Sequence, residues 1–68
     1  MPETPFGPLE SLVGRTFEDP AGIVRTVEDI GPDRVFGLEC DGHSSLADFG
    51  MLVEPFSAWL RGAEEVTQ

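Results

Sequence analysis

Three turn signals in the middle of the chain constrain its fold most. Residues 19–22 read Asp-Pro-Ala-Gly, typical of a type I turn because proline fixes φ at the second position and glycine tolerates a positive φ at the last. Residues 31–33, Gly-Pro-Asp, form a second signal, and the Asp-Gly pair at 41–42 is a strong hairpin signal. The segments before, between and after these turns are rich in strand-forming residues. The sequence therefore predicts an antiparallel meander with strands at 15–18, 23–30 and 34–40.

The pattern changes after the third turn. Apolar residues then recur at spacings of three and four, which is typical of a helix, at Leu46, Phe49 and Val53. Two signals compete over 43–47, because the Asp-Gly turn calls for a fourth strand whereas Ser45 resembles a helix cap. A short strand at 43–45 running into a helix satisfies both.

The last part of the chain is also expected to be helical. Pro55 should end the preceding helix, because proline disfavours helical geometry in the residue before it. Ser57 is a good cap for a final helical segment. The apolar stripe of that segment is Trp59, Leu60, Ala63 and Val66.

The N-terminus contrasts with the rest. Residues 1–7 contain two prolines and are expected to form a flexible arm anchored by Phe6. A single helical turn should follow over 8–14, between a proline and a glycine, with Leu9, Leu12 and Val13 on one face. Residues 8–68 are expected to form one small domain.

The expected fold class is α+β, a small antiparallel β-meander of three to four strands with short, chiefly C-terminal helices. Two architectures remain open: an SH3-like barrel, and an open sheet with the C-terminal helices across one face. The helical spacing after residue 45 favours the open sheet. The strand at 34–40 alternates, and the face that carries Phe36, Leu38 and Cys40 is expected to point to the core. Other predicted core residues include Val13, Phe17, Val27, Leu46, Phe49, Leu52, Phe56 and Leu60.

A chain of 68 residues buries a small core and commonly needs a further support. A single cysteine, Cys40, excludes an internal disulfide, and one cysteine with one histidine, His43, cannot complete a structural zinc site. No cofactor or metal is expected. The core alone must suffice, or the chain forms a homodimer.

The charge balance narrows the choice of partners. Thirteen acidic residues face four basic ones, all arginine, for a formal net charge of -9. This charge should repel nucleic acid and anionic membranes and favour a protein with a basic surface, unless it serves solubility alone. No apolar run approaches the roughly 20 residues of a membrane span. Residues 1–5 do not resemble a secretory signal, so a cytoplasmic location is expected.

No constellation predicts an enzyme. Cys40 and His43 could meet across the third turn as nucleophile and base, but a free cysteine on an apolar face is more typical of a small buried hydrophobe. The acidic residues lack the spacing of a calcium loop, and no glycine-rich phosphate loop is present.

The acidic residues instead cluster beside the turns. Because alternate turns of a meander lie at the same end of the sheet, two acidic ends are predicted. One consists of Glu18, Asp19 and Asp41, and the other of Glu28, Asp29 and Asp33. Phe56 and Trp59 are expected to pack on the sheet, or to form a partner-binding hot spot if they are exposed.

These features predict a non-catalytic, acidic interaction protein, such as an inhibitor or immunity-like protein that binds a basic surface of a macromolecular partner. Two alternatives remain open: an oligomeric structural or assembly subunit of a phage or mobile element, and a small-ligand or cation-binding module.

Overall fold

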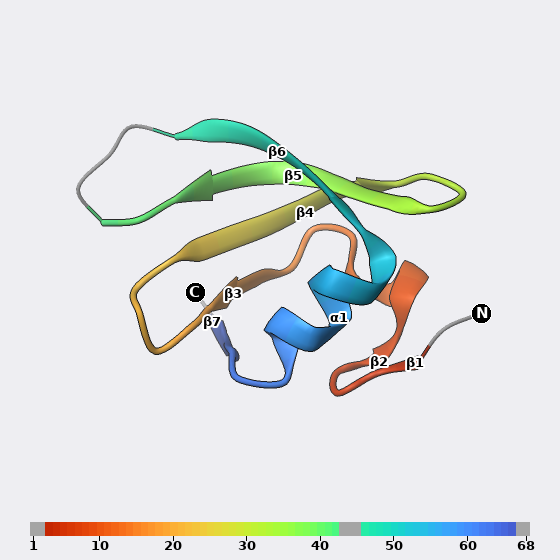
Figure 1. The fold of residues 1–68 in the computed structure, drawn as a ribbon, viewed down its shortest axis with the longest axis horizontal. Coiled ribbons are helices and arrows are strands. Elements are labelled where there is room, and N and C mark those ends of the chain that lie inside the picture. The colour runs from red at the N-terminus through yellow and green to blue at the C-terminus, as the bar shows by residue number, and fades with distance from the viewer. Residues whose placement is uncertain (1–2, 43–45, 67–68) are drawn as a thin grey trace.

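The computed structural model describes residues 3–42 and 46–66, which form an antiparallel β structure with one short α-helix near the C-terminus (Figure 1). The elements in chain order are β1 (Glu3–Thr4), β2 (Gly7–Pro8), the 3-10 helix η1 (Leu9–Leu12), β3 (Thr16–Glu18), β4 (Val24–Ile30), β5 (Arg34–Cys40), β6 (Ala47–Leu52), α1 (Val53–Leu60) and β7 (Glu64–Val66).

The main sheet has five strands in the order β6-β5-β4-β3-β7, and every neighbouring pair is antiparallel. Strands β3 to β6 follow one another as a meander, and β7 returns to pair with β3. The predicted meander is confirmed, and β5 has the predicted bounds. The predicted count of three to four strands is too low, because β7 was not foreseen and 47–52 was predicted to be helical.

The first turn follows its sequence signal. The Gly22 N–H donates to the Asp19 carbonyl at 3.0 Å, and Gly22 has a φ of +89°. Asp19 and Gly22 thus supply the hydrogen bond and the positive φ that close the β3–β4 hairpin.

The predicted helix over 46–53 is wrong. Ala47–Leu52 forms β6, which pairs with β5 along its length. Residues 47, 49 and 51 also alternate, and this period of two places Phe49 opposite Gly37 on the core face. Leu46, a predicted core residue, is 66% exposed. The strand predicted at 43–45 and the cap predicted at Ser45 lie outside the described residues.

The helix begins later than expected. Pro55, predicted to end a helix, is the third residue of α1. Proline fits there because the first N–H groups of a helix have no partner within the helix. Ser57, predicted as a cap, lies inside α1, and the predicted final helical stripe is interrupted by β7.

The core lies between one face of the sheet and the segments that cover it. Figure 1 shows α1 and the β1–β2 hairpin on the same side of β4, β5 and β6. Phe56 and Leu60 of α1 are fully buried, and Phe6 contacts Phe17 with ring centroids 4.8 Å apart. The buried apolar residues are Leu9, Leu12, Phe17, Val27, Val35, Phe49, Phe56, Leu60 and Ala63. Val13, predicted to join Leu9 and Leu12, is exposed.

The predicted orientation of β5 is inverted. Val35 is fully buried and Gly37 is buried, whereas Phe36 is 41% exposed on the opposite face, hereafter the outer face. A glycine inside the sheet leaves room for a neighbour, and the ring of Phe49 fills that room. Phe49 of β6 therefore determines which face of β5 is buried, and the largest side chain of β5, Phe36, does not. Cys40 is half-buried on the outer face.

Candidate functional site

The strand register places the acidic residues of the turns at two ends of the sheet. Glu18 pairs with Val24, which pairs with Cys40, so the first turn and the start of the β5–β6 connection lie at one end. This end, with Glu18, Asp19 and Asp41, is hereafter the Asp19 end. The turn between β4 and β5 lies at the opposite end, hereafter the Asp33 end, with Glu28, Asp29 and Asp33.

At the Asp19 end, Asp19 is used inside the protein. Its Oδ1 accepts hydrogen bonds from the N–H groups of Ala21 (3.0 Å) and Ile23 (2.9 Å), and its Oδ2 accepts one from Trp59 Nε1 (2.7 Å). The backbone bond from Ile23 is the main cause that lowers the pKa of this carboxyl, and the Trp59 bond adds to it. Asp19 therefore ties the first turn to α1.

The predicted aromatic pair lies on the inner side of α1. Phe56 is fully buried, with its ring stacked 6.0 Å from that of Phe49, so it is not accessible to a partner. Trp59 is half-buried, 5.7 Å from the Phe56 ring, and the Arg25 guanidinium lies 4.6 Å from its ring centroid. Trp59 thus holds the helix to the sheet through a cation–π contact and its bond to Asp19.

Among the described residues, Arg15 and Arg25 form ion pairs. Arg15 forms a two-pronged pair with Glu65, from Nε at 2.9 Å and from a terminal nitrogen at 2.7 Å, which lowers the pKa of Glu65. Arg25 donates to Glu39 at 2.9 Å. These pairs neutralise acids on the inner face, whereas the acids of the Asp33 end form no ion pair with the described residues.

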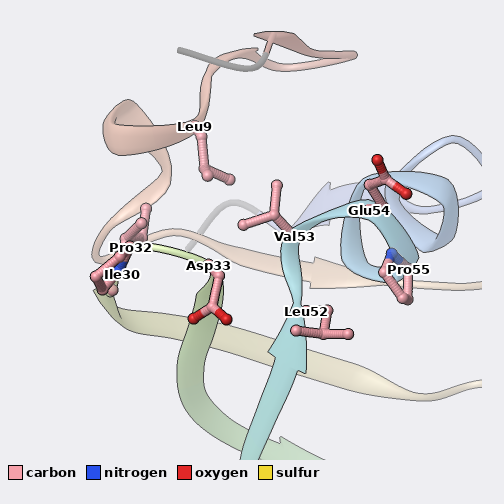
Figure 2. Close-up of a pocket in the computed structure, with 9 residues that line it drawn as sticks. Leu9, Ile30, Pro32, Asp33, Leu52, Val53, Glu54 and Pro55 are labelled. Carbon is pink, nitrogen blue, oxygen red and sulfur yellow. The ribbon is translucent and has the colours of Figure 1, made fainter.

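The Asp33 end contains a pocket of about 540 Å³ with mainly apolar walls (Figure 2). The turn after β4 forms one side and the junction of β6 with α1 the other. The Val53 N–H donates to the Asp33 carbonyl at 3.1 Å and joins the two sides. The lining residues are Leu9, Ile30, Gly31, Pro32, Asp33, Leu52, Val53, Glu54 and Pro55.

The apolar surface continues from the pocket onto the outer face. Leu52 lines the pocket and is 46% exposed. Phe36 of the neighbouring strand β5 is paired with Gly50, two residues before Leu52, and lies on the same face as Leu52. The Phe36 ring also lies close to Gly31, where an added Cβ would be 3.2 Å from it. Phe36 and Leu52, both predicted to be core residues, therefore form an exposed apolar patch beside the pocket.

Carboxylates lie at and near this surface: Asp33 and Glu54 line the pocket, and Asp29 is paired with Phe36 across the two strands. Glu28 lies at the irregularity in β4, where the register shifts between Val27 and Asp29. Asp29, Asp33 and Glu54 are also exposed, and Asp29 Oδ1 accepts a hydrogen bond from the Ile30 N–H at 2.9 Å. Arg34 is paired with Leu52 across β5 and β6 and adds a positive charge.

Sequence reasoning found Glu28, Asp29 and Asp33 at this end but missed Leu52 and Glu54. Both lie where β6 becomes α1, whereas the sequence predicted the change from strand to helix near residue 45. The signal present in the sequence was Pro55, because proline is well tolerated in the first turn of a helix.

Two other hollows are less suited to an apolar ligand. One of about 690 Å³ runs along α1 between Glu3 and Arg61 and has a more polar lining. The other, of about 270 Å³, lies at the Asp19 end between Glu18 and Glu64.

Within residues 3–42 and 46–66, no group of three or more histidine, cysteine or acidic side chains is arranged to hold a metal ion. The predicted Cys40–His43 pairing involves a residue outside that range. In the described part of the chain, no helix combines the length and apolar character needed to cross a bilayer.

The sequence matches no protein-family model, and it matches neither a curated protein nor a solved structure. Its function is therefore argued from its own surfaces.

Proposed function

We propose that this chain is a non-catalytic interaction protein that binds a basic surface of a protein partner, in the manner of an inhibitor or immunity protein. The observation that carries the proposal is the Asp33 end, where the exposed acids Asp33 and Glu54 line an apolar pocket and Asp29 lies beside the exposed apolar residue Phe36. Apolar contact at the centre with charge at the rim is the usual arrangement of a protein interface.

The net charge of -9 supports the choice of a basic partner. A strongly negative surface attracts a positive one over distances of about a Debye length and raises the association rate. The same charge opposes binding to nucleic acid and anionic lipid.

Two finer parts of the proposal concern the type of fold and the location. The return of β7 to β3 after a four-strand meander, with α1 between β6 and β7, fits an SH3-like barrel. The proposed location is the cytoplasm, where a single free thiol such as Cys40 stays reduced.

The proposal is tested by affinity capture with the immobilised protein at about 50 mM and about 500 mM salt, which spans strong and weak screening. We expect retained proteins to be basic and to elute at the higher salt concentration. A variant neutralised at the Asp33 end (Asp29→Asn, Asp33→Asn, Glu54→Gln) should lose them. A variant with three other acids neutralised (Glu10→Gln, Glu18→Gln, Glu64→Gln) has the same net charge and should keep them. Absence of any salt-sensitive basic protein would overturn the proposal.

A second candidate function, self-association as an assembly subunit, is favoured by the exposed patch of Phe36 and Leu52. Sedimentation equilibrium of the wild type and of Phe36→Ser/Leu52→Ser tests it. A wild-type dimer that dissociates in the double variant would support this function, and a monomeric wild type at millimolar concentration would exclude it.

A further inference from the structure

We propose that the pocket at the Asp33 end binds a basic peptide segment, with an apolar side chain of the peptide in the pocket and lysine or arginine residues on either side of it. This inference rests on the proposed function and specifies its binding site and the chemistry of the partner.

The walls of the pocket favour an apolar side chain. Leu9, at the inner wall, is buried, and Ile30, Pro32, Leu52 and Val53 add further apolar surface. The volume of about 540 Å³ lies in the range typical of ligand pockets, so a side chain together with part of its peptide backbone can enter.

The carboxylates favour cationic groups on both sides of that side chain. Figure 2 shows Asp33 and Glu54 on opposite sides of Val53, and both residues line the pocket. Asp29 adds a third carboxylate on the outer face, where its strand position is paired with Phe36. A peptide that places its apolar residue in the pocket therefore brings its flanking residues beside negative charge.

The pocket is held in shape before any ligand arrives. The hydrogen bond from the Val53 N–H to the Asp33 carbonyl, 3.1 Å long, fixes the turn against the start of α1. Pro32 and Pro55 restrict the backbone on either side. A site that needs little ordering loses less free energy on binding.

Charge favours a basic segment over a second copy as the occupant of the pocket. Two copies each carry a net charge of -9, and the Asp33 end of each is itself acidic. A basic segment gains from the same field that repels a second copy.

The test uses three blocked hexapeptides, each with a fluorophore: Arg-Arg-Leu-Leu-Arg-Arg, Arg-Arg-Gly-Gly-Arg-Arg and Glu-Glu-Leu-Leu-Glu-Glu. Fluorescence anisotropy gives the Kd, and amide NMR shifts report the site. We expect the first peptide to bind at least about tenfold more tightly than either other one, because only it combines charge with apolar burial. Its largest shifts should fall at Ile30, Asp33 and Val53.

Matched variants separate the pocket from the overall charge. Asp33→Asn/Glu54→Gln and Glu18→Gln/Glu64→Gln each remove two of the nine excess negative charges. The first pair should weaken binding of Arg-Arg-Leu-Leu-Arg-Arg by about tenfold and the second by no more than about twofold, because rim charges act most strongly on nearby groups. Leu52→Gln should also weaken it, whereas Val66→Gln, which changes another exposed apolar residue, should not.

The outcomes distinguish this inference from the proposed function. If both charge variants weaken binding equally, or if the glycine peptide binds as tightly as the leucine peptide, the pocket inference is overturned and a diffuse acidic surface remains. If arginine amide alone produces the same shifts, the occupant is a small cation and the inference is also overturned. If captured basic proteins are retained but no hexapeptide binds, the proposed function stands without this pocket. If no basic protein is captured and no hexapeptide binds, both the proposed function and the pocket inference are overturned.

Discussion

At the scale of single residues, Gly37 is the position where the smallest change should cost most. An added Cβ would overlap the Thr26 backbone oxygen and lie 2.9 Å from Phe49 Cε1. The oxygen belongs to the neighbouring strand β4 and cannot move without disturbing the sheet. We expect Gly37→Ala to lower the free energy of unfolding by about 2–3 kcal/mol, as overpacked cores do. Urea unfolding measures this change.

The matched control for this prediction is Gly62→Ala. No heavy atom outside its immediate neighbours lies within 4 Å of a Cβ at Gly62, and Gly62 does not have a positive φ. Its unfolding midpoint should stay unchanged or rise slightly, because alanine restricts the unfolded chain. Equal midpoints for the two variants would contradict the close approach of β4 and β5.

Asp19 should show its structural role through its titration. Its pKa lies below the ordinary 3.8, chiefly because of the Ile23 N–H and further because of Trp59 Nε1. A carboxyl whose folded pKa is lowered adds stability above its unfolded pKa and loses it as the pH falls through the folded pKa. The stability difference between the wild type and Asp19→Asn should therefore be largest near neutral pH and shrink in acid.

Carboxyl NMR titration of Trp59→Phe checks the same contact separately. The pKa of Asp19 should rise in this variant but stay below 3.8, because the bonds from Ile23 and Ala21 remain. Glu65, whose pKa is lowered mainly by Arg15, should titrate unchanged and serves as the internal reference. An Asp19 pKa that does not move would show that the indole bond is absent in solution.

At the scale of elements, the sequence predicted correctly those strands and turns whose position depends on residues close together in the chain. The bounds of β5 and the first turn follow from residues next to one another, such as Asp19 and Gly22. The choice between strand and helix at 46–53 does not follow from nearby residues, because Phe49 fits both a helical spacing and an alternating one. Its pairing with Gly37 on β5 decides the matter, and that contact joins residues twelve positions apart.

The candidate site shows the same limit. Its acids on β4 and in the second turn were predicted, because acidic residues beside a turn are visible in sequence. The apolar pocket was not, because it forms where Leu52 and Val53 at the start of α1 meet Leu9 from η1, more than forty positions earlier. The alternation of β5 separates Phe36 from Val35, but nothing local shows that Val35 is the residue that points inward.

Helix α1 contains a buried hydroxyl that leads to a further prediction. Ser57 Oγ is buried and has no hydrogen-bond partner among the described residues. Removing an unsatisfied buried polar group is favourable, and alanine is also the better helix former. We expect Ser57→Ala to raise the free energy of unfolding by about 1 kcal/mol. The reverse exchange at exposed Ala58, Ala58→Ser, should lower it by a few tenths of a kcal/mol. Loss of stability in Ser57→Ala would mean that the hydroxyl has a partner in solution.

At the scale of the whole molecule, the excess of acidic residues over basic ones creates electrostatic repulsion. A net charge of -9 is carried on a chain whose radius of gyration is 10.9 Å, comparable to the Debye length of about 10 Å at 0.1 M salt. Charges on opposite sides of the protein, whose extents are 34 × 22 × 20 Å, are therefore largely screened from one another at this salt concentration. Screening also weakens the two ion pairs, Arg15–Glu65 and Arg25–Glu39, but partly exposed pairs contribute only about 0–1 kcal/mol each.

Repulsion should outweigh the ion pairs, so sodium chloride is expected to stabilise the protein. Between about 10 mM and about 500 mM salt the Tm should rise by about 5 °C, which corresponds to roughly 1 kcal/mol for a domain of this size. Glu18→Gln/Glu28→Gln reduces the net charge from -9 to -7 and changes only exposed side chains. It should have a higher Tm at low salt and a smaller response to added salt. Differential scanning calorimetry measures both quantities, and a Tm that falls with salt would show that the ion pairs dominate. The same repulsion that weakens the isolated fold is relieved when a basic partner binds, so the expected partner should stabilise this protein most at low salt.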